Sequence, residues 1–232
     1  VSVTKGEVNI LDGTFKVEPY EGNYGYTINC IDGNFNNGSA DVSIKGGKFY
    51  NFNPQNNAAE GTGTNFLIAK YAAVQDSEGY WTVVPAVAVI DDYYYATIEE
   101  AIAAANDGDV VKLVANVTLN YGAREAFGND SITSLTIDGN GYTLTLNQTN
   151  SDWSSFGLKN NAKLVLNNVT VNKSGKGATS GAWNTHAIIF TCAVEMNDVE
   201  VLLHVKSVRA GVAVDLVTAV IHSKAYQRVV LL

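Results

Sequence analysis

Several acidic residues stand at spacings that could support acid–base chemistry or hold a metal ion. Asp91–Asp92 and Glu99–Glu100 are adjacent acids, and residues 107–109 read Asp-Gly-Asp. Glycoside hydrolysis needs two carboxyl groups that face each other across a bond, and a calcium loop needs further acids at regular intervals. The sequence offers neither arrangement. A turn or a helix start explains each group, so we predict no catalytic residue, no metal site and no cofactor.

Basic residues do not supply a site either. The chain has three arginines, and none of them lies in a strand-like phrase beside an acidic cluster; they are Arg124, Arg209 and Arg228. His186 is expected to be an ordinary strand or loop residue. We therefore predict that the chain is not an enzyme.

The two cysteines, Cys30 and Cys192, are far apart and lack the spacing of a metal site. Because apolar or strand-forming residues flank both, we expect two buried, small hydrophobic side chains. A disulfide between them is the alternative, which nothing in the sequence supports.

Aromatic side chains gather in three segments rich in polar residues. Tyr94 lies in a run of three tyrosines, Trp153 and Phe156 lie in SDWSSFG, and Trp183 lies in GAWNTH. Rings flanked by Asn, Asp and Ser suit sugars, which present C–H patches and hydroxyls. Trp153 and Trp183 are separated by the length of one repeat, so they could align on one face of a repeating fold. Glycan binding is one hypothesis, and packing over coil ends or under loops is the other.

The composition argues against two classes of partner. The chain has 232 residues, a formal net charge of −8 and 16% charged residues. Nucleic-acid binding needs clustered Lys and Arg, and an acidic chain is repelled by anionic lipid. No apolar run approaches the roughly 18 residues of a membrane span. We expect no nucleic-acid partner and no membrane insertion, while the oligomeric state is left open.

A repeated phrase predicts the fold. Alternating apolar residues followed by an Asn, Asp or Gly bend occur in LTIDGNGYTL (135–144), LVLNNVTV (164–171) and VEMNDVEV (194–201). Ile137, Leu166 and Met196 occupy equivalent places in these phrases, at nearly equal intervals. Their spacing lies within the range of roughly 20–50 residues that is typical of solenoids, whose stacked coils share one core. Asn and Gly suit the bends because they tolerate left-handed backbone angles.

A less regular set precedes these repeats. It consists of VNILDGTF (8–15), TINCIDGNF (27–35) and VSIKGGKF (42–49). The intervals between Gly13, Gly33 and Gly47 are unequal, and the second interval is the shorter. We expect the same kind of coil, with one coil shortened or opened. A β-sandwich with evenly spaced strands is the alternative.

One segment, YATIEEAIAAANDGDVVKLV (95–114), has the pattern of a helix. Thr97 and Glu100 form an S/T-x-x-E capping box, and an apolar stripe at helical spacing consists of Ile98, Ala101, Ile102 and Ala105. We predict a helix at about 97–106, ended by a turn in which Gly108 can adopt a left-handed cap. A strand, VVKLVANVTL, follows.

The helix and its strand, YATIEEAIAAANDGDVVKLVANVTL, resemble the opening of pectin-lyase-like right-handed parallel β-helix modules of gut-bacterial surface proteins. Residues 44–85 resemble the closing segment of such a module, which leads into a terminal hairpin. The resemblance implies an all-β fold, a right-handed parallel β-helix, with the helix covering the open N-terminal end of a first coil. It also implies that residues 1–85 are the C-terminal part of one module and 86–201 the N-terminal part of the next.

Both ends of the chain carry further expectations. The chain starts abruptly in a strand-like segment, without Met or a signal peptide, which suggests a fragment of a longer protein with its export signal upstream. From about residue 202 the Asn, Thr and Gly bends give way to dense Val and Leu with His, Arg and Lys. Segment 202–232 is therefore atypical: either a strand pair or amphipathic terminal segment that covers the last coil, or a stretch in a non-native reading frame.

These features predict a non-catalytic, adhesin-like repeat protein, extracellular or at a bacterial cell surface, that binds a polysaccharide or a host surface glycan or protein. Two alternatives stay open. The pectin-lyase-like superfamily includes polysaccharide lyases and hydrolases, so the chain could be a fragment of one whose catalytic coils lie elsewhere. A phage tail or receptor-binding fibre is the other.

Overall fold

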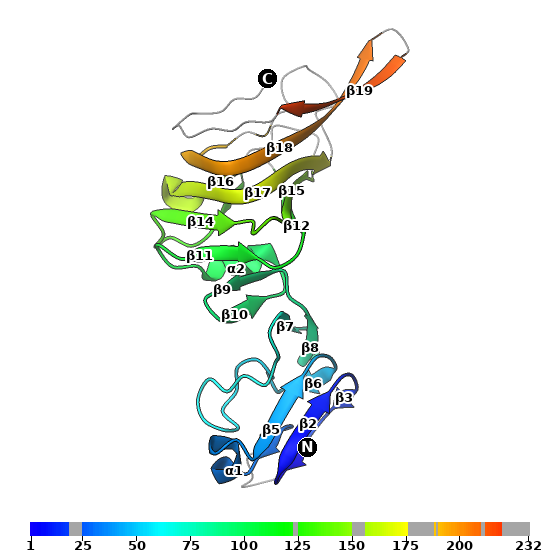
Figure 1. Cartoon of the computed structure of the whole chain (residues 1–232), viewed down its shortest axis with the longest axis vertical. Coiled ribbons are helices and arrows are strands. Elements are labelled where there is room, and N and C mark those ends of the chain that lie inside the picture. Colours follow the sequence, from blue (N-terminus) through cyan, green and yellow to red (C-terminus); the bar gives the residue numbers. More distant parts are fainter. Residues whose placement is uncertain are drawn as a thin grey trace. The chain divides into compact units, whose positions relative to one another are not determined.

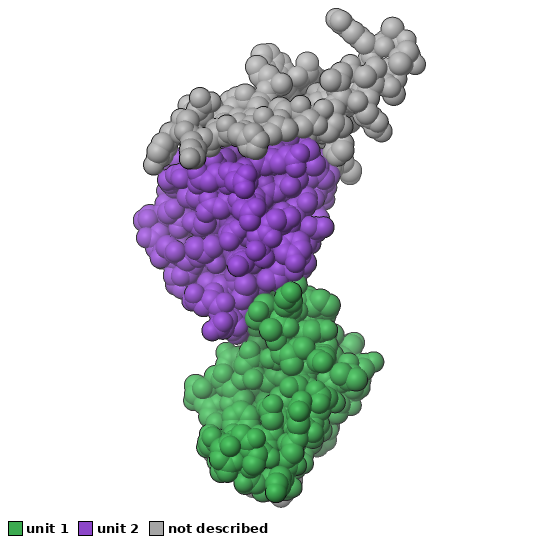
Figure 2. All heavy atoms as spheres, in the orientation of Figure 1, with its two compact units in different colours: residues 1–86, 94–96 green, residues 87–93, 97–232 purple. Residues whose placement is uncertain are grey.

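The computed structural model describes residues 1–18, 25–122, 125–149, 156–175, 188, 190–209 and 212–219. The chain is mostly β and forms a solenoid of about 6 turns. It divides into two compact units, which Figure 2 distinguishes by colour. Unit 1 comprises residues 1–86 and 94–96, and unit 2 comprises residues 87–93 and 97–232. Among the described residues, no helix has the length and apolar character needed to cross a membrane.

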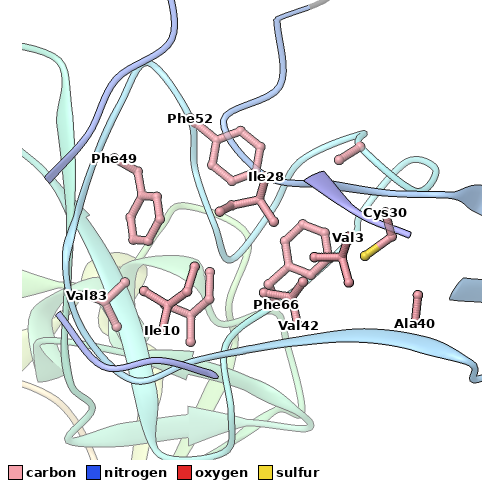
Figure 3. Packing of buried hydrophobic residues seen from close by; sticks show 12 residues of the cluster. Val3, Ile10, Ile28, Cys30, Ala40, Val42, Phe49, Phe52, Phe66 and Val83 are labelled. Atoms are coloured by element: carbon pink, nitrogen blue, oxygen red, sulfur yellow. The ribbon is translucent and has the colours of Figure 1, made fainter. Parts of the chain in front are cut away.

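Unit 1 is built from two coils of three short strands. The first coil consists of β1 (Ser2–Val3), β2 (Gly6–Ile10) and β3 (Thr14–Phe15), and the second of β4 (Asn29–Cys30), β5 (Ala40–Ile44) and β6 (Lys48–Tyr50). Each strand of the first coil pairs in parallel with its counterpart in the second. Their inward side chains, among them Ile10, Val42 and Phe49, meet in one buried cluster (Figure 3). Parallel pairing between coils confirms the solenoid and excludes the β-sandwich.

The register corrects the alignment of the first repeat set. Val8 lies opposite Val42, so the first and third segments of that set are the equivalent ones. The prediction that residues 27–35 repeat them is wrong. This segment continues from β4 into helix α1 (Asp32–Asn36), which contains Gly33. The second coil is therefore extended by a helix rather than shortened.

A loop and a hairpin close the end of unit 1 that follows its second coil. The hairpin consists of β7 (Tyr71–Gln75) and β8 (Tyr80–Pro85), and β8 pairs antiparallel with β6. From the loop between β6 and β7, Phe52 and Phe66 enter the buried cluster (Figure 3).

Glu60, in the same loop, satisfies a strand edge. Asn29 donates its N–H to the carbonyl of Val1, and Ile31 donates its N–H to the carbonyl of Val3 in β1. The N–H of Cys30, which lies between them, therefore points to the opposite edge of β4. Glu60 Oε1 accepts that N–H at 2.5 Å, while Glu60 Oε2 is covered and has no hydrogen-bond partner in the described part of the chain. Burial raises the pKa of the Glu60 carboxyl above 4.5, although the bond from Cys30 opposes the shift.

Unit 2 stacks further coils in the same way. Its first coil consists of β11 (Val110–Leu113), β12 (Val117–Tyr121) and β13 (Glu125–Phe127), and its second of β14 (Ser134–Asp138), β15 (Thr143–Gln148) and β16 (Phe156–Leu158). The long strands β17 (Lys163–Gly175) and β18 (Val194–Arg209) continue the stack, and all these coil-to-coil pairs are parallel. Figure 1 shows β11, β14, β17 and β18 stacked in that order. The single strand predicted in VVKLVANVTL is wrong, because a bend at residues 114–116 divides it into β11 and β12.

The predicted inner ladder is confirmed. Ile137 lies opposite Leu166, and Leu166 lies opposite Met196; all three are buried. The bends after this ladder have left-handed backbone angles, with φ of 50° at Asn140, 45° at Asn168 and 55° at Asp198. Asn and Asp tolerate these angles better than other residues with a side chain.

Helix α2 (Ile98–Ala104) covers the start of unit 2, and its capping box between Thr97 and Glu100 is present as predicted. Its predicted apolar stripe is buried: Ile98, Ala101, Ile102 and Ala105. The helix packs on β9 (Ala88–Ile90), β12 and β13. Strand β9 pairs antiparallel with β11 and so covers its edge, and β10 (Tyr93–Tyr95) adjoins β9.

The segment after residue 202 begins within β18. Strand β18 pairs antiparallel with β19 (Val212–Ala219), which agrees with the strand-pair interpretation of this region. Residues 220–232 lie outside the described residues. The proposed change of reading frame stays a prediction that the coding DNA would test.

Substituting Gly139 by Ala is expected to destabilise unit 2. A Cβ at Gly139 would lie 2.3 Å from Val169 Cβ and 2.5 Å from Asn168 O in the next coil. Overpacking against a neighbouring backbone costs about 3 kcal/mol, and thermal unfolding would show the loss. Gly33→Ala is the control, because its Cβ would meet nothing within 4 Å and Ala favours a helix. Equal stability of Gly139→Ala and the wild type would contradict the close approach of the coils.

Substituting Glu60 by Gln is expected to remove the loss of unit 1 stability that the wild type undergoes as pH rises, although it leaves the amide Nε2 covered without a partner. A carboxyl whose pKa is raised on folding binds more protons in the folded state, so stability falls as pH rises from 4.5 through the folded pKa. The amide keeps an acceptor for the Cys30 N–H and removes this loss. Hydrogen exchange of unit 1 peptides, compared with wild type at each pH, should show protection that grows with pH. The control is Glu78→Gln, an exposed carboxylate in the hairpin turn; an equal effect there would refute the role of Glu60.

Candidate functional site

The outer surface of β12, β15 and β17 carries polar side chains at every second position. Successive side chains of a strand point to opposite faces, so the buried aliphatic residues of these strands leave polar residues outside. The outward residues are exposed or half-buried: Thr118, Asn120, Thr143, Thr145, Asn147, Thr170, Asn172 and Ser174. We call these eight residues the polar face.

Parallel register aligns the polar face in rows that cross the coils. Thr118 lies opposite Thr145, and Thr145 lies opposite Asn172. Neighbouring strands in a sheet are about 4.8 Å apart, so hydroxyl and amide groups recur at that interval along each row. The face therefore presents a regular array of uncharged hydrogen-bonding groups.

Hydrogen bonds between coils hold one of these rows in place. Asn147 Nδ2 donates to Asn120 Oδ1 at 2.7 Å, and Ser174 Oγ donates to Asn147 Oδ1 at 3.2 Å. In the adjoining row, Asn172 Oδ1 is covered and has no hydrogen-bond partner among the described residues. The array is thus ordered by the protein, and the covered Asn172 Oδ1 is not accessible to a ligand on the face.

A hollow of about 180 Å³ adjoins the polar face at the bends of the coils. Its lining residues are Gly141, Asn168, Val169, Thr170, Asp198, Val199 and Glu200. The register explains how it forms. The bend between β14 and β15 spans positions 139–142, whereas the equivalent bends in β17 and β18 span only positions 168–169 and 198–199. The longer bend, 139–142, protrudes beside the two shorter bends and forms one wall of the hollow.

The rim of the hollow is acidic. Asp198 and Glu200 are exposed carboxylates, and Thr170 Oγ1 donates to Glu200 Oε2 at 3.4 Å. No Lys or Arg is among the described residues that line it. A nearby carboxylate, Glu195, is not part of the hollow: the Lys163 ammonium hydrogen-bonds to it and holds its pKa below the ordinary range.

Three polar side chains lie inside the coils rather than on the polar face. Tyr121, Gln148 and Lys173 are 1%, 2% and 7% exposed. Burial raises the pKa of Tyr121 to about 12 and lowers the pKa of Lys173, because it disfavours the charged form of each. The Tyr121 hydroxyl therefore stays protonated at neutral pH.

The structure describes two of the four residues expected from the sequence to bind a glycan, Phe156 and Tyr94. Phe156 is 1% exposed and stacks on Phe127 with a centroid distance of 5.1 Å, so its ring offers no face to a sugar. Tyr94 is half-buried in unit 1, where its carbonyl accepts a hydrogen bond from Gln55 Nε2 at 2.7 Å. Trp153 and Trp183 lie outside the described residues.

The acidic groups have the structural roles expected of them. Glu100 closes the capping box of α2, and Asp91 lies in a turn with a φ of 51°. Asp107 Oδ1 accepts the N–H groups of Thr133 and Ser134 at 2.7 and 2.9 Å, and these bonds hold the pKa of Asp107 below its ordinary value.

Metal-ligating and nucleophilic residues do not converge in the part of the chain that the structure describes. No group of three or more His, Cys, Asp or Glu could hold a metal ion there. Cys30 is free and buried as predicted, whereas Cys192 is free but only half-buried. Arg124, His186 and Arg228 lie outside the described residues.

The polar face has a signal in the sequence, although the aromatic clusters suggested a binding site elsewhere. Residues 143–147 read Thr-Leu-Thr-Leu-Asn, and residues 170–174 read Thr-Val-Asn-Lys-Ser. Alternation of this kind identifies the buried positions, and the same pattern identifies the residues that face outward.

No protein-family model, curated protein or solved structure matches the chain. The fold defines its class as a parallel β-solenoid. Function is therefore inferred from the geometry of the described residues.

Proposed function

We propose that the chain belongs to a non-catalytic, adhesin-like repeat protein, secreted or on a bacterial surface, that binds a hydroxyl-rich polysaccharide along the polar face. The observation that carries the proposal is the alignment of Thr, Asn and Ser side chains on three successive coils. The resemblance of residues 95–119 to pectin-lyase-like modules of gut-bacterial surface proteins supports the localisation.

A repeating ligand suits a repeating surface. Each sugar of a polysaccharide presents similar hydroxyls, so a chain laid across the coils can repeat the same hydrogen bond at the hydroxyls of Thr118 and Thr145, which lie opposite each other. The face is uncharged, which favours neutral groups, and the bonds from Asn147 and Ser174 limit the side-chain entropy lost on binding. Individual bonds contribute little, so affinity comes from their number.

The double variant Thr118→Val/Thr145→Val tests this role. It removes two hydroxyls from one row while keeping the β-branched shape, and at about 1 kcal/mol per hydrogen bond it should weaken binding by roughly thirtyfold. A glycan array would select the polysaccharide, and calorimetry would measure the affinity.

The control is Thr14→Val, which removes an exposed hydroxyl from β3 of unit 1 and should bind like the wild type. Absence of binding to any glycan would overturn the proposal, as would equal affinity in the double variant. Release of unsaturated or reducing products from uronate polymers would replace it with the lyase or hydrolase alternative.

A further inference from the structure

We propose that the hollow beside the polar face selects the sugar, and that it takes an amino sugar in its ammonium form in preference to a uronic acid. This inference rests on the proposed glycan binding and adds a charge preference to it. The polar face supplies hydrogen bonds along an extended ligand, and the hollow distinguishes between sugars by their charge.

The hollow is placed to act on the same ligand. Thr170 belongs both to its lining and to the polar face, in the row Thr143–Thr170–Glu200. A glycan on the polar face that follows this row reaches the hollow. Its volume of about 180 Å³ equals roughly six water molecules at ~30 Å³ each. This space accommodates one small group of a polymer rather than a drug-sized molecule.

The walls and floor of the hollow follow from the lengths of the bends. Residues 139–142 form the wall that protrudes on one side of the hollow. A Cβ at Gly141 would meet nothing within 4 Å, so the space next to this wall is open. Val169 and Val199 are buried between the rim residues and keep the bends closely packed. The hollow thus comes from the difference between successive coils and does not require a loop to move.

The charge around the hollow determines what enters it. Asp198 and Glu200 place two carboxylates on its rim, and the lining residues that the structure describes supply no positive charge. Because both carboxylates are exposed, water weakens their interaction with a bound charge. The interaction still attracts an ammonium group and repels a carboxylate group.

A divalent metal ion is a poorer fit than an ammonium group. Calcium takes six to eight oxygen ligands, and the hollow offers two carboxylates with the Asn168 amide and the Thr170 hydroxyl. An ammonium group carries three donors, which these same acceptors match.

The test compares oligomers of one length that carry different charges: cationic glucosamine, neutral N-acetylglucosamine and anionic galacturonate. The wild type should bind the glucosamine oligomer most tightly and the galacturonate oligomer least. Asp198→Asn keeps a residue that tolerates the φ of 55°, and Glu200→Gln keeps an acceptor for Thr170. Each should weaken glucosamine binding about fivefold and leave N-acetylglucosamine binding unchanged. The glucosamine preference should also shrink as salt rises.

The control variant is Asp130→Asn, which removes an exposed carboxylate of unit 2 that does not line the hollow. Circular dichroism would verify folding of every variant. Binding that depends on Thr118 and Thr145, with an unchanged glucosamine preference in Asp198→Asn and Glu200→Gln, overturns this inference and leaves the proposed function intact. Tighter binding of galacturonate also overturns it, whereas binding of no glycan overturns both.

Discussion

The structure depends on one constraint: a coil of parallel strands cannot satisfy its own edges or bury its own inner face. Inside a stack, the next coil supplies both the hydrogen bonds and the apolar contacts. At an end, a different element must do so. In unit 2, α2 buries the core and β9 pairs with the edge of β11. In unit 1, the loop carrying Phe52 and Phe66 and the strand β8 perform the equivalent tasks.

Glutamates complete these caps where no strand is available. Glu99 Oε1 accepts the N–H of Asn120 at 3.3 Å on β12, as Glu60 does for Cys30 on β4. The two bonds differ in their surroundings: the Asn120 bond is exposed, whereas one oxygen of Glu60 is covered without a partner among the described residues. A carboxylate at an exposed edge therefore satisfies an N–H with little desolvation, and the same device at a covered edge makes stability depend on pH.

Local patterns in the sequence predicted the structural elements that depend on local interactions. The inner ladder follows from alternating aliphatic residues, and α2 follows from the capping box at Thr97. Helix α1 has no side-chain cap and depends on tertiary packing, so no local pattern predicted it. Phe156, which belongs to the predicted aromatic site, is buried for a related reason. Composition identifies a ring near polar residues, but only the register shows that its strand turns it into the core.

The hollow was visible in the sequence only as a difference in spacing. Ile137 and Leu144 stand further apart along the chain than Leu166 and Val171 do, and that difference has no meaning until the register makes both pairs equivalent. In a solenoid, faces repeat because the core requires it, and the bends are free to vary in length and charge. In the proposed glycan-binding role, the faces supply affinity for a repeating ligand and the bends supply discrimination between ligands. Asp198 differs from its counterpart in the previous coil, Asn168, by one additional charge.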